Sequence, residues 1–363
     1  MPPPSIHRKA SNTTVRTRYI ICTALASITI LTITEFLNPD WFGYKKIFSE
    51  GGSWLLDQGR DPLFLLLLST FQQLMGEDSY DEFRTGMAIV FIVFLAFLCA
   101  GRILPYGPSA PKLLPMSLAV LLFTVTRFTI TIREGLALVI FLIGLRKMYQ
   151  WHYGTGFALV FAILAALVHG GTLMLLSALI ISTATVWAGS DTGFSRLRRS
   201  HQWIPLAIVI GILAGLALST SSVVLSASSR DFSTEPVLGG GLGKFSFWAA
   251  TGLAVALTAS EAYSTFGNST APPKLKAFVG VLCIFFLPTI YSATIIQIMA
   301  NGSPELIAAT IRAQQMIVAL LVLMTTFIAP IRVRLMLVIV FLLIDQVRTV
   351  YTSLLTTMII VTG

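Results

Sequence analysis

Six ionisable residues lie in or beside the long apolar stretches of this 363-residue chain. A charged side chain at the centre of a membrane costs on the order of 3 kcal/mol on insertion scales, so such residues are candidates for a functional site. They are Arg133, Glu134, His169, Arg312, Asp345 and Arg348. Arginine presents a fixed fork of donors to phosphate oxygens, and histidine can exchange protons near neutral pH. The arginines and the histidine therefore suit the binding of an anionic lipid headgroup with proton transfer beside it.

Each candidate also has a purely structural interpretation. Arg133 can be an interfacial arginine whose long side chain reaches the lipid headgroups. His169 lies in the segment LAALVHGGTLMLL, where His-Gly-Gly indicates a break between two helices, and the ring can simply close that hairpin. Asp345 and Arg348 are three residues apart and share a helix face, where an ion pair would neutralise both charges. The sequence leaves these alternatives open.

The composition predicts the elements that must position these residues. Hydrophobic residues make up 55% of the chain and charged residues only 11%, whereas soluble domains carry about 25% charged residues. So few charges cannot cover a water-exposed surface of this size, so the chain is predicted to be an all-α, polytopic integral membrane protein. The formal net charge of +9 is explained by basic loops on the cytoplasmic side rather than by nucleic-acid binding.

The apolar stretches predict eleven membrane spans. Their residue ranges are 19–37, 87–104, 112–128, 133–149, 155–169, 171–187, 203–221, 244–260, 277–300, 306–328 and 334–360. Residues 1–18 are predicted to form a basic cytoplasmic N-terminus, and residues 19–363 a single multi-pass membrane domain. This topology puts 15 of the 25 Lys and Arg residues on the cytoplasmic side, as the positive-inside rule requires.

A twelfth apolar stretch, Pro62–Met75, has only 14 residues. A full span needs about 20 apolar residues, so this segment is predicted to be a re-entrant or interfacial helix. If it crossed the membrane, every later loop would change sides and the basic loops would face outward. The topology in which it does not cross places Arg133, His169 and the start of the span that holds Arg312 at the outer face.

The run IREGLALVIFLIGLRKMYQWHYGTGFALVFAILAALVHGGTLMLL resembles the central signature of the EpsG family of Wzy-type polysaccharide polymerases. That signature has Ile-Arg-Gln, an apolar helix, a basic turn, a second apolar helix and a histidine near its end. Arg133 and His169 match its arginine and histidine. Upstream, Asp61 opens the run DPLFLLLLSTFQQLMG, which is similar to the family's segment of an acidic residue, proline and an aromatic residue. Arg312 resembles a later arginine of the family.

The chain also departs from the family pattern. Glu134 stands where glutamine is usual, and Gly170 follows His169 where an aromatic residue is common. Arg312 lacks the aromatic residues that normally follow the later arginine. The closely matching part covers roughly residues 61–175.

The resemblance implies a glycosyltransferase that needs no cofactor and no metal. Such a polymerase joins oligosaccharide repeat units linked to undecaprenyl pyrophosphate at the outer, periplasmic face of the bacterial cytoplasmic membrane. Arg133 and Arg312 would bind the pyrophosphate, and His169, or Asp61 as second choice, would take the proton of the attacking hydroxyl. Glu134, Asp345 and Arg348 are lesser candidates. Expected partners are the lipid-linked oligosaccharide, the bilayer and a chain-length regulator, and a GT-C-like helix arrangement is one option.

Other functions would use the same substrate. A flippase for lipid-linked oligosaccharides would also place arginines in a cavity, but transporters of this kind commonly show repeats, and none is found here. An O-antigen ligase shares the donor but usually has a large outer loop, whereas the loops here have at most about 25 residues. A membrane acyltransferase would be expected to have a histidine-rich motif, and the chain has only four histidines.

Overall fold

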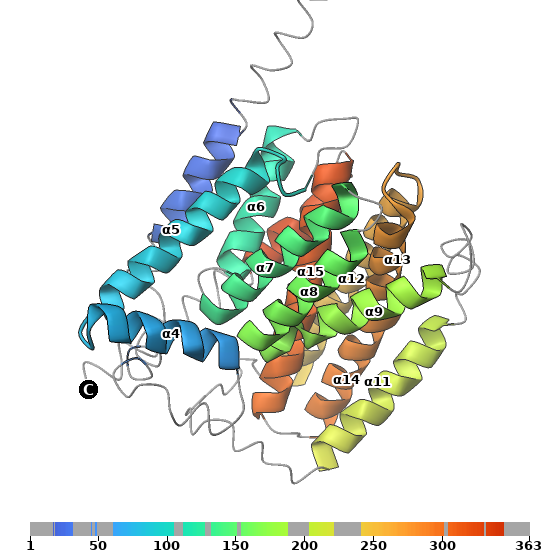
Figure 1. Cartoon of the computed structure of the whole chain (residues 1–363). Coiled ribbons are helices and arrows are strands. Elements are labelled where there is room, and N and C mark those ends of the chain that lie inside the picture. Colours follow the sequence, from blue (N-terminus) through green and yellow to red (C-terminus); the bar gives the residue numbers. More distant parts are fainter. Residues whose placement is uncertain are drawn as a thin grey trace, which may run out of the picture. The chain divides into compact units, whose positions relative to one another are not determined.

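The structure is a computed structural model of the whole chain, and every secondary-structure element it describes is helical. It describes residues 17, 19–31, 45, 48, 61–104, 112–127, 132–150, 154–187, 203–220, 241–300, 304–329 and 332–344. Figure 1 shows the helices that these ranges form. The prediction of an all-helical fold is confirmed over this part of the chain.

The labelled helices follow one another with short connections. Their bounds are α4 Pro62–Met75, α5 Tyr80–Cys99, α6 Leu113–Arg127, α7 Ile132–Gln150, α8 Gly154–Val168, η1 Gly170–Thr172, α9 Leu173–Trp187, α11 Trp203–Thr220, α12 Gly241–Gly267, α13 Pro273–Val281, η2 Leu282–Phe286, α14 Leu287–Met299 and α15 Pro304–Ile328. Two further apolar helices are Tyr19–Leu31 and Val333–Ile344.

The predicted bounds agree well with these helices, with two corrections. The short segment is α4 with the predicted ends, Pro62 and Met75. Helix α5 begins at Tyr80 rather than residue 87, because Asp81 and Glu82 form its first turn, where acidic side chains favour the helix dipole. Helix α12 continues to Gly267, so Glu261 is a buried residue of a helix and not the inner-loop residue that the topology predicted.

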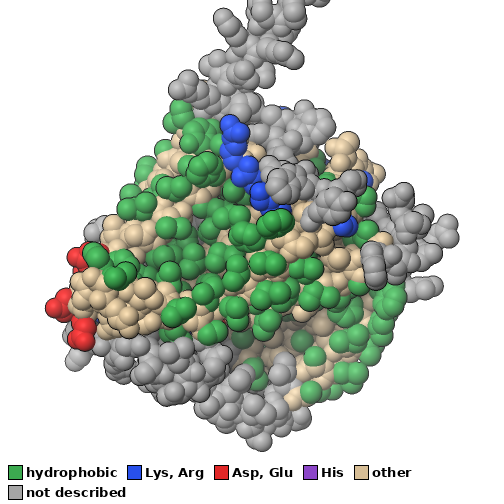
Figure 2. Space-filling view, in the orientation of Figure 1, with side chains coloured by type: hydrophobic (Ala, Val, Ile, Leu, Met, Phe, Trp, Pro, Cys, Tyr) green, Lys and Arg blue, Asp and Glu red, His purple; other side chains and the backbone are tan. Residues whose placement is uncertain are grey.

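Three helices are long and apolar enough to cross a membrane: Tyr80–Cys99, Pro273–Met299 and Ala309–Ile328. Seven other apolar helices have between 10 and 17 residues. Apolar side chains such as Ile89, Val93 and Phe97 of α5 are exposed, and Figure 2 shows hydrophobic side chains over much of the viewed face. The chain is thus a helical membrane protein, and the count of eleven spans stays a prediction.

The helices divide into two compact units. The first comprises Met1–Leu176 with Leu323–Gly363, and the second comprises Ser177–Val322. The single membrane domain predicted for residues 19–363 stays a prediction, and each unit is described by itself below.

Helices α7 and α8 of the first unit form a tightly packed hairpin that depends on two glycines. A Cβ atom at Gly144 of α7 would lie 2.6 Å from Cβ of Phe161 in α8. A Cβ atom at Gly154, the first residue of α8, would collide with the carbonyl oxygen of Lys147. Small residues of this kind let membrane helices approach closely, and the close packing fixes the ends of α7 and α8 relative to each other.

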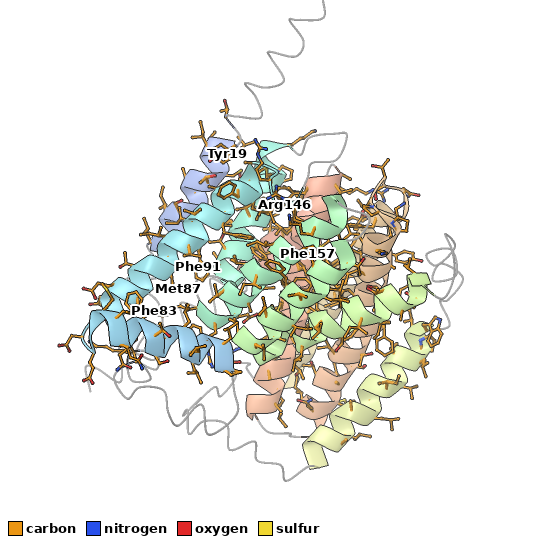
Figure 3. The ribbon with its side chains drawn as sticks, viewed as in Figure 1. Tyr19, Phe83, Met87, Phe91, Arg146 and Phe157 are labelled. Carbon is orange, nitrogen blue, oxygen red and sulfur yellow. The ribbon has the colours of Figure 1, made fainter. Side chains whose placement is uncertain are left out.

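An aromatic cluster holds α4 against the start of α5. The rings of Phe71 and Phe83 have centroids 5.3 Å apart, and those of Phe64 and Phe83 are 6.3 Å apart. Phe48 adds ring contacts to the same group. Figure 3 shows Phe83, Met87 and Phe91 along α5, and all three side chains are buried. This packing sets the direction in which α4 runs back to its first residue.

Helices α11 and α14 make the closest pair of the second unit. A Cβ atom at Gly215 of α11 would lie 2.8 Å from the carbonyl oxygen of Ala293 in α14. The Thr289 hydroxyl donates to the carbonyl oxygen of Ala207 at 3.0 Å. Between α13 and α14 the helix widens to the π-helical segment Leu282–Phe286, directly before Pro288, which has no N–H to donate to the preceding turn.

Candidate functional site

Asp61 precedes the first residue of α4 and has an unusual backbone conformation. Its φ of 47° and ψ of 48° are left-handed, and among the described residues it is the only non-glycine with positive φ. Aspartate tolerates this conformation better than most residues, and Pro62 then starts the helix with its fixed φ. The Asp61 side chain makes no cap hydrogen bond to α4, so the interpretation of Asp61 as a helix cap is wrong.

The carboxylate of Asp61 binds Arg133, the second residue of α7. Nη1 of Arg133 donates to Oδ2 of Asp61, although the two residues are 72 positions apart in the chain. The side chains of Arg133 and Asp61 are 15% and 8% exposed, so water screens this ion pair only weakly. The pair orients the guanidinium of Arg133 at the end of α7.

The second oxygen of the same carboxylate binds the break after α8. The backbone N–H of Gly170 donates to Oδ1 of Asp61 at 2.9 Å. His169 lies at this break with an extended backbone, φ −152° and ψ 115°. Thr172 holds the break in place, because its N–H and hydroxyl donate to the His169 carbonyl oxygen at 3.0 and 2.8 Å. The predicted break at His-Gly-Gly is confirmed.

The ring of His169 lies beside the ion pair of Asp61 and Arg133. Its Nδ1 is 3.8 Å from Oδ2 of Asp61, which is beyond hydrogen-bond distance. That nitrogen is buried and has no hydrogen-bond partner among the described residues, whereas the side chain as a whole is 26% exposed. The exposed part of the ring is therefore away from Nδ1.

These contacts keep Asp61 ionised. Burial alone would raise the pKa of Asp61, but the His169 ring, the Arg133 guanidinium and the Gly170 N–H together lower that pKa below its ordinary value of 3.8. A carboxylate with a lowered pKa is a weak base at neutral pH. The geometry therefore favours an orienting role for Asp61 over proton abstraction.

The structure brings together three of the predicted site residues: Asp61, Arg133 and His169. All three lie in the first unit. Glu134 is also there, buried in the first turn of α7. Arg312 lies on α15 in the second unit and is half-buried, so its predicted meeting with Arg133 stays a prediction. Asp345 and Arg348 lie outside the described residues.

Sequence reasoning missed the roles of Gly170, Gly171 and Thr172. A threonine three residues after a helix break commonly donates to the backbone of that break, and this signal was available. No signal in the sequence pointed to the contact between Gly170 N–H and Asp61. In the part of the chain that the structure describes, no group of three His, Cys, Asp or Glu residues could hold a metal ion.

Comparison with known proteins gives one family. The model of the EpsG family matches residues 18–361. No curated protein and no solved structure matches the chain. The family match runs through almost the whole chain and includes Asp61, Arg133 and His169, and it supports a role in polysaccharide biosynthesis. This helical membrane protein therefore belongs to the EpsG family.

Proposed function

We propose that the protein is a Wzy-type polysaccharide polymerase that joins oligosaccharide repeat units carried on undecaprenyl pyrophosphate. The observation that carries this proposal is the cluster of Asp61, Arg133 and His169. It combines a cation for a pyrophosphate, a carboxylate that orients the cation and an imidazole beside both. Membership of the EpsG family supports glycan polymerisation as the reaction.

The reaction joins two lipid-linked glycans. A hydroxyl oxygen at the non-reducing end of the incoming unit forms a bond to the anomeric carbon of the growing glycan. The bond between that carbon and the pyrophosphate oxygen breaks, and its electron pair leaves with the lipid pyrophosphate. The hydroxyl proton passes to a base on the protein. The reaction needs no nucleotide sugar, because the pyrophosphate is already the leaving group.

Arg133 is proposed to stabilise the leaving group. Negative charge develops on the pyrophosphate oxygens as the anomeric bond breaks, and a preorganised cation lowers the energy of that state. A guanidinium has five N–H donors, and the contact with Asp61 uses Nη1. The ion pair with Asp61 keeps the fork in one orientation before substrate arrives, which reduces reorganisation during the reaction. Arg312 is proposed as a second cation for the same pyrophosphate.

His169 is proposed to take the hydroxyl proton. A general base must lie within hydrogen-bond reach of the proton that it abstracts, and the ring of His169 is partly exposed beside Arg133. Asp61 is the poorer choice, because two donors already hold its carboxylate and its pKa is lowered. We therefore assign proton transfer to His169 and orientation to Asp61.

The reaction is proposed to occur at the outer face of the bacterial cytoplasmic membrane. Figure 2 shows acidic side chains where α4 meets α5 and basic side chains toward the other end of α5. The acidic group includes the exposed Asp81 and Glu82, and the exposed Arg102 follows the last turn. Basic residues favour the cytoplasmic side, which supports an outward start for α5. A chain-length regulator is proposed as a partner.

The test uses purified protein in liposomes supplied with a synthetic undecaprenyl-pyrophosphate repeat unit. We expect a ladder of products that differ by whole repeats, and no ladder from Arg133→Ala at equal protein level. A single product in which the glycan has moved to a different acceptor would indicate a ligase. Movement of the intact lipid-linked unit across the vesicle membrane without any new glycosidic bond would indicate a flippase. Either result would contradict the proposal.

A further inference from the structure

The two glycines after His169 have different surroundings. A Cβ atom at Gly170 would have nothing within 4 Å. A Cβ atom at Gly171 would lie 2.8 Å from Nε2 of His169 and 3.1 Å from its Cδ2. A carbon this close to the ring cannot be accommodated unless the ring moves. Only glycine at position 171 therefore leaves the observed position of the His169 ring unobstructed.

The ring has little freedom to move away. Its Nδ1 edge is buried and faces Oδ2 of Asp61 at 3.8 Å. The backbone at His169 is fixed by the two donors of Thr172, whose side chain is fully buried. A displacement caused by a larger residue 171 would therefore change the distance from the ring to Asp61.

The two ring nitrogens have different environments. Nδ1 is buried and its nearest charged atom is a carboxylate oxygen, so a proton on Nδ1 would be stabilised there. The partner of one nitrogen decides which tautomer a histidine adopts, and a proton on Nδ1 leaves the lone pair on Nε2. Nε2 is the nitrogen beside Gly171, on the side of the ring away from Asp61.

We propose that Gly171 is a positioning residue that keeps Nε2 of His169 open to the acceptor hydroxyl, while Asp61 holds the proton on Nδ1. This inference rests on the proposed polymerase function and names the atom that takes the proton. As the glycosidic bond forms and the bond to pyrophosphate breaks, the hydroxyl proton moves to Nε2. The resulting imidazolium is stabilised by the ionised carboxylate of Asp61.

The first experiment compares Gly171→Ala with Gly156→Ala in the same polymerisation assay. Gly156 is a matched control, because it lies in α8 and a Cβ atom there would have nothing within 4 Å. We expect Gly171→Ala to lower kcat by about 100-fold, the order of effect that a misplacement of about 1 Å produces, with a smaller change in KM. Gly156→Ala should keep the wild-type rate. Equal rates for the two variants would overturn the inference.

The second experiment needs no substrate and so separates this inference from the polymerase proposal. Diethyl pyrocarbonate acylates unprotonated, accessible imidazole nitrogens, and mass spectrometry of peptides reports the rate at His169 separately from the other three histidines. We expect His169 of the folded wild-type protein to react, and to react at least about tenfold more slowly in Gly171→Ala. An unreactive His169 in the wild type, or an unchanged rate in Gly171→Ala, would overturn the inference.

The two proposals fail in different ways. A wild-type protein whose His169 reacts as expected but which makes no ladder contradicts the polymerase function and leaves the position of the ring intact. If Gly171→Ala does not accumulate in the membrane, the reactivity of the wild-type histidine still decides whether Nε2 is open.

Discussion

The carboxylate of Asp61 accepts a hydrogen bond from the backbone N–H of Gly170, a residue 109 positions later in the chain. Its other oxygen binds Arg133. One side chain thus joins the start of α4 to the start of α7 and to the break after α8. Because Gly170 directly follows His169, the geometry of the proposed base and of the proposed pyrophosphate ligand depends on the same carboxylate.

Asp61→Asn should weaken this connection without removing it. The amide oxygen can still accept from one donor, but the charge that binds Arg133 is lost, and hydrogen bonds to charged groups contribute about 1.5–3 kcal/mol. We expect a lower thermal midpoint for the detergent-solubilised protein and a large loss of polymer. Asp61→Ala should be less stable than Asp61→Asn, because asparagine tolerates the left-handed backbone and alanine does not.

The effect of Asp61 on stability should depend on pH in a defined direction. The contacts lower the pKa of Asp61, so its contribution is present above the ordinary pKa of 3.8 and is lost as the pH falls through the lowered value. The difference in thermal midpoint between wild type and Asp61→Asn should stay constant from pH 8 to about pH 5. It should vanish only in stronger acid. A difference that already shrinks between pH 8 and 6 would mean that burial dominates and raises the pKa.

Arg133→Lys tests whether the guanidinium is needed for its shape or only for its charge. A lysine ammonium is a point charge and cannot reproduce the planar fork that binds a carboxylate and a phosphate together. We expect most polymerisation activity to be lost while the membrane protein level stays near normal. Full activity in Arg133→Ala would show that Arg133 is an interfacial anchor that contacts lipid headgroups.

The hairpin of α7 and α8 should tolerate no side chain at Gly154. A Cβ atom there would collide with the carbonyl oxygen of Lys147, and backbone atoms cannot move aside as a flexible side chain can. Overpacking of this kind costs about 1–3 kcal/mol. We expect Gly154→Ala to lower the thermal midpoint measured by fluorescence-detected gel filtration. Gly156→Ala, which meets open space, should keep or raise it; equal midpoints would contradict the packing.

Much of the local structure could be predicted from the sequence. The short helix Pro62–Met75 follows from an apolar run bounded by Asp-Pro and Gly, and the break at His169 follows from two glycines between apolar arms. The contacts of Asp61 could not be predicted, because they join residues 72 and 109 positions apart and one sequence carries no information on such pairing. The left-handed backbone of Asp61 and the approach of the His169 ring to Gly171 depend on those contacts.

The proposed orientation in the membrane can be tested with single cysteines introduced at Ser195 and Pro273. Both positions lie in loops predicted to be cytoplasmic because basic residues surround them. The three native cysteines are buried, so a membrane-impermeant thiol reagent should report on the new residue. We expect labelling only after the membrane is made permeable. Labelling of either position in intact cells would reverse the topology and place the site on the cytoplasmic side.

The most direct test of the proposed mechanism is the product ladder of His169→Gln beside that of the wild type, measured with purified proteins at equal concentration in liposomes. Glutamine keeps hydrogen-bonding groups near the position of the ring but has no useful basicity. If His169 takes the proton of the acceptor hydroxyl, the wild type makes a ladder of whole repeats and His169→Gln makes none, while both proteins show the same thermal midpoint. A full-length ladder from His169→Gln would contradict the mechanism and leave His169 with only a structural role in closing the break after α8.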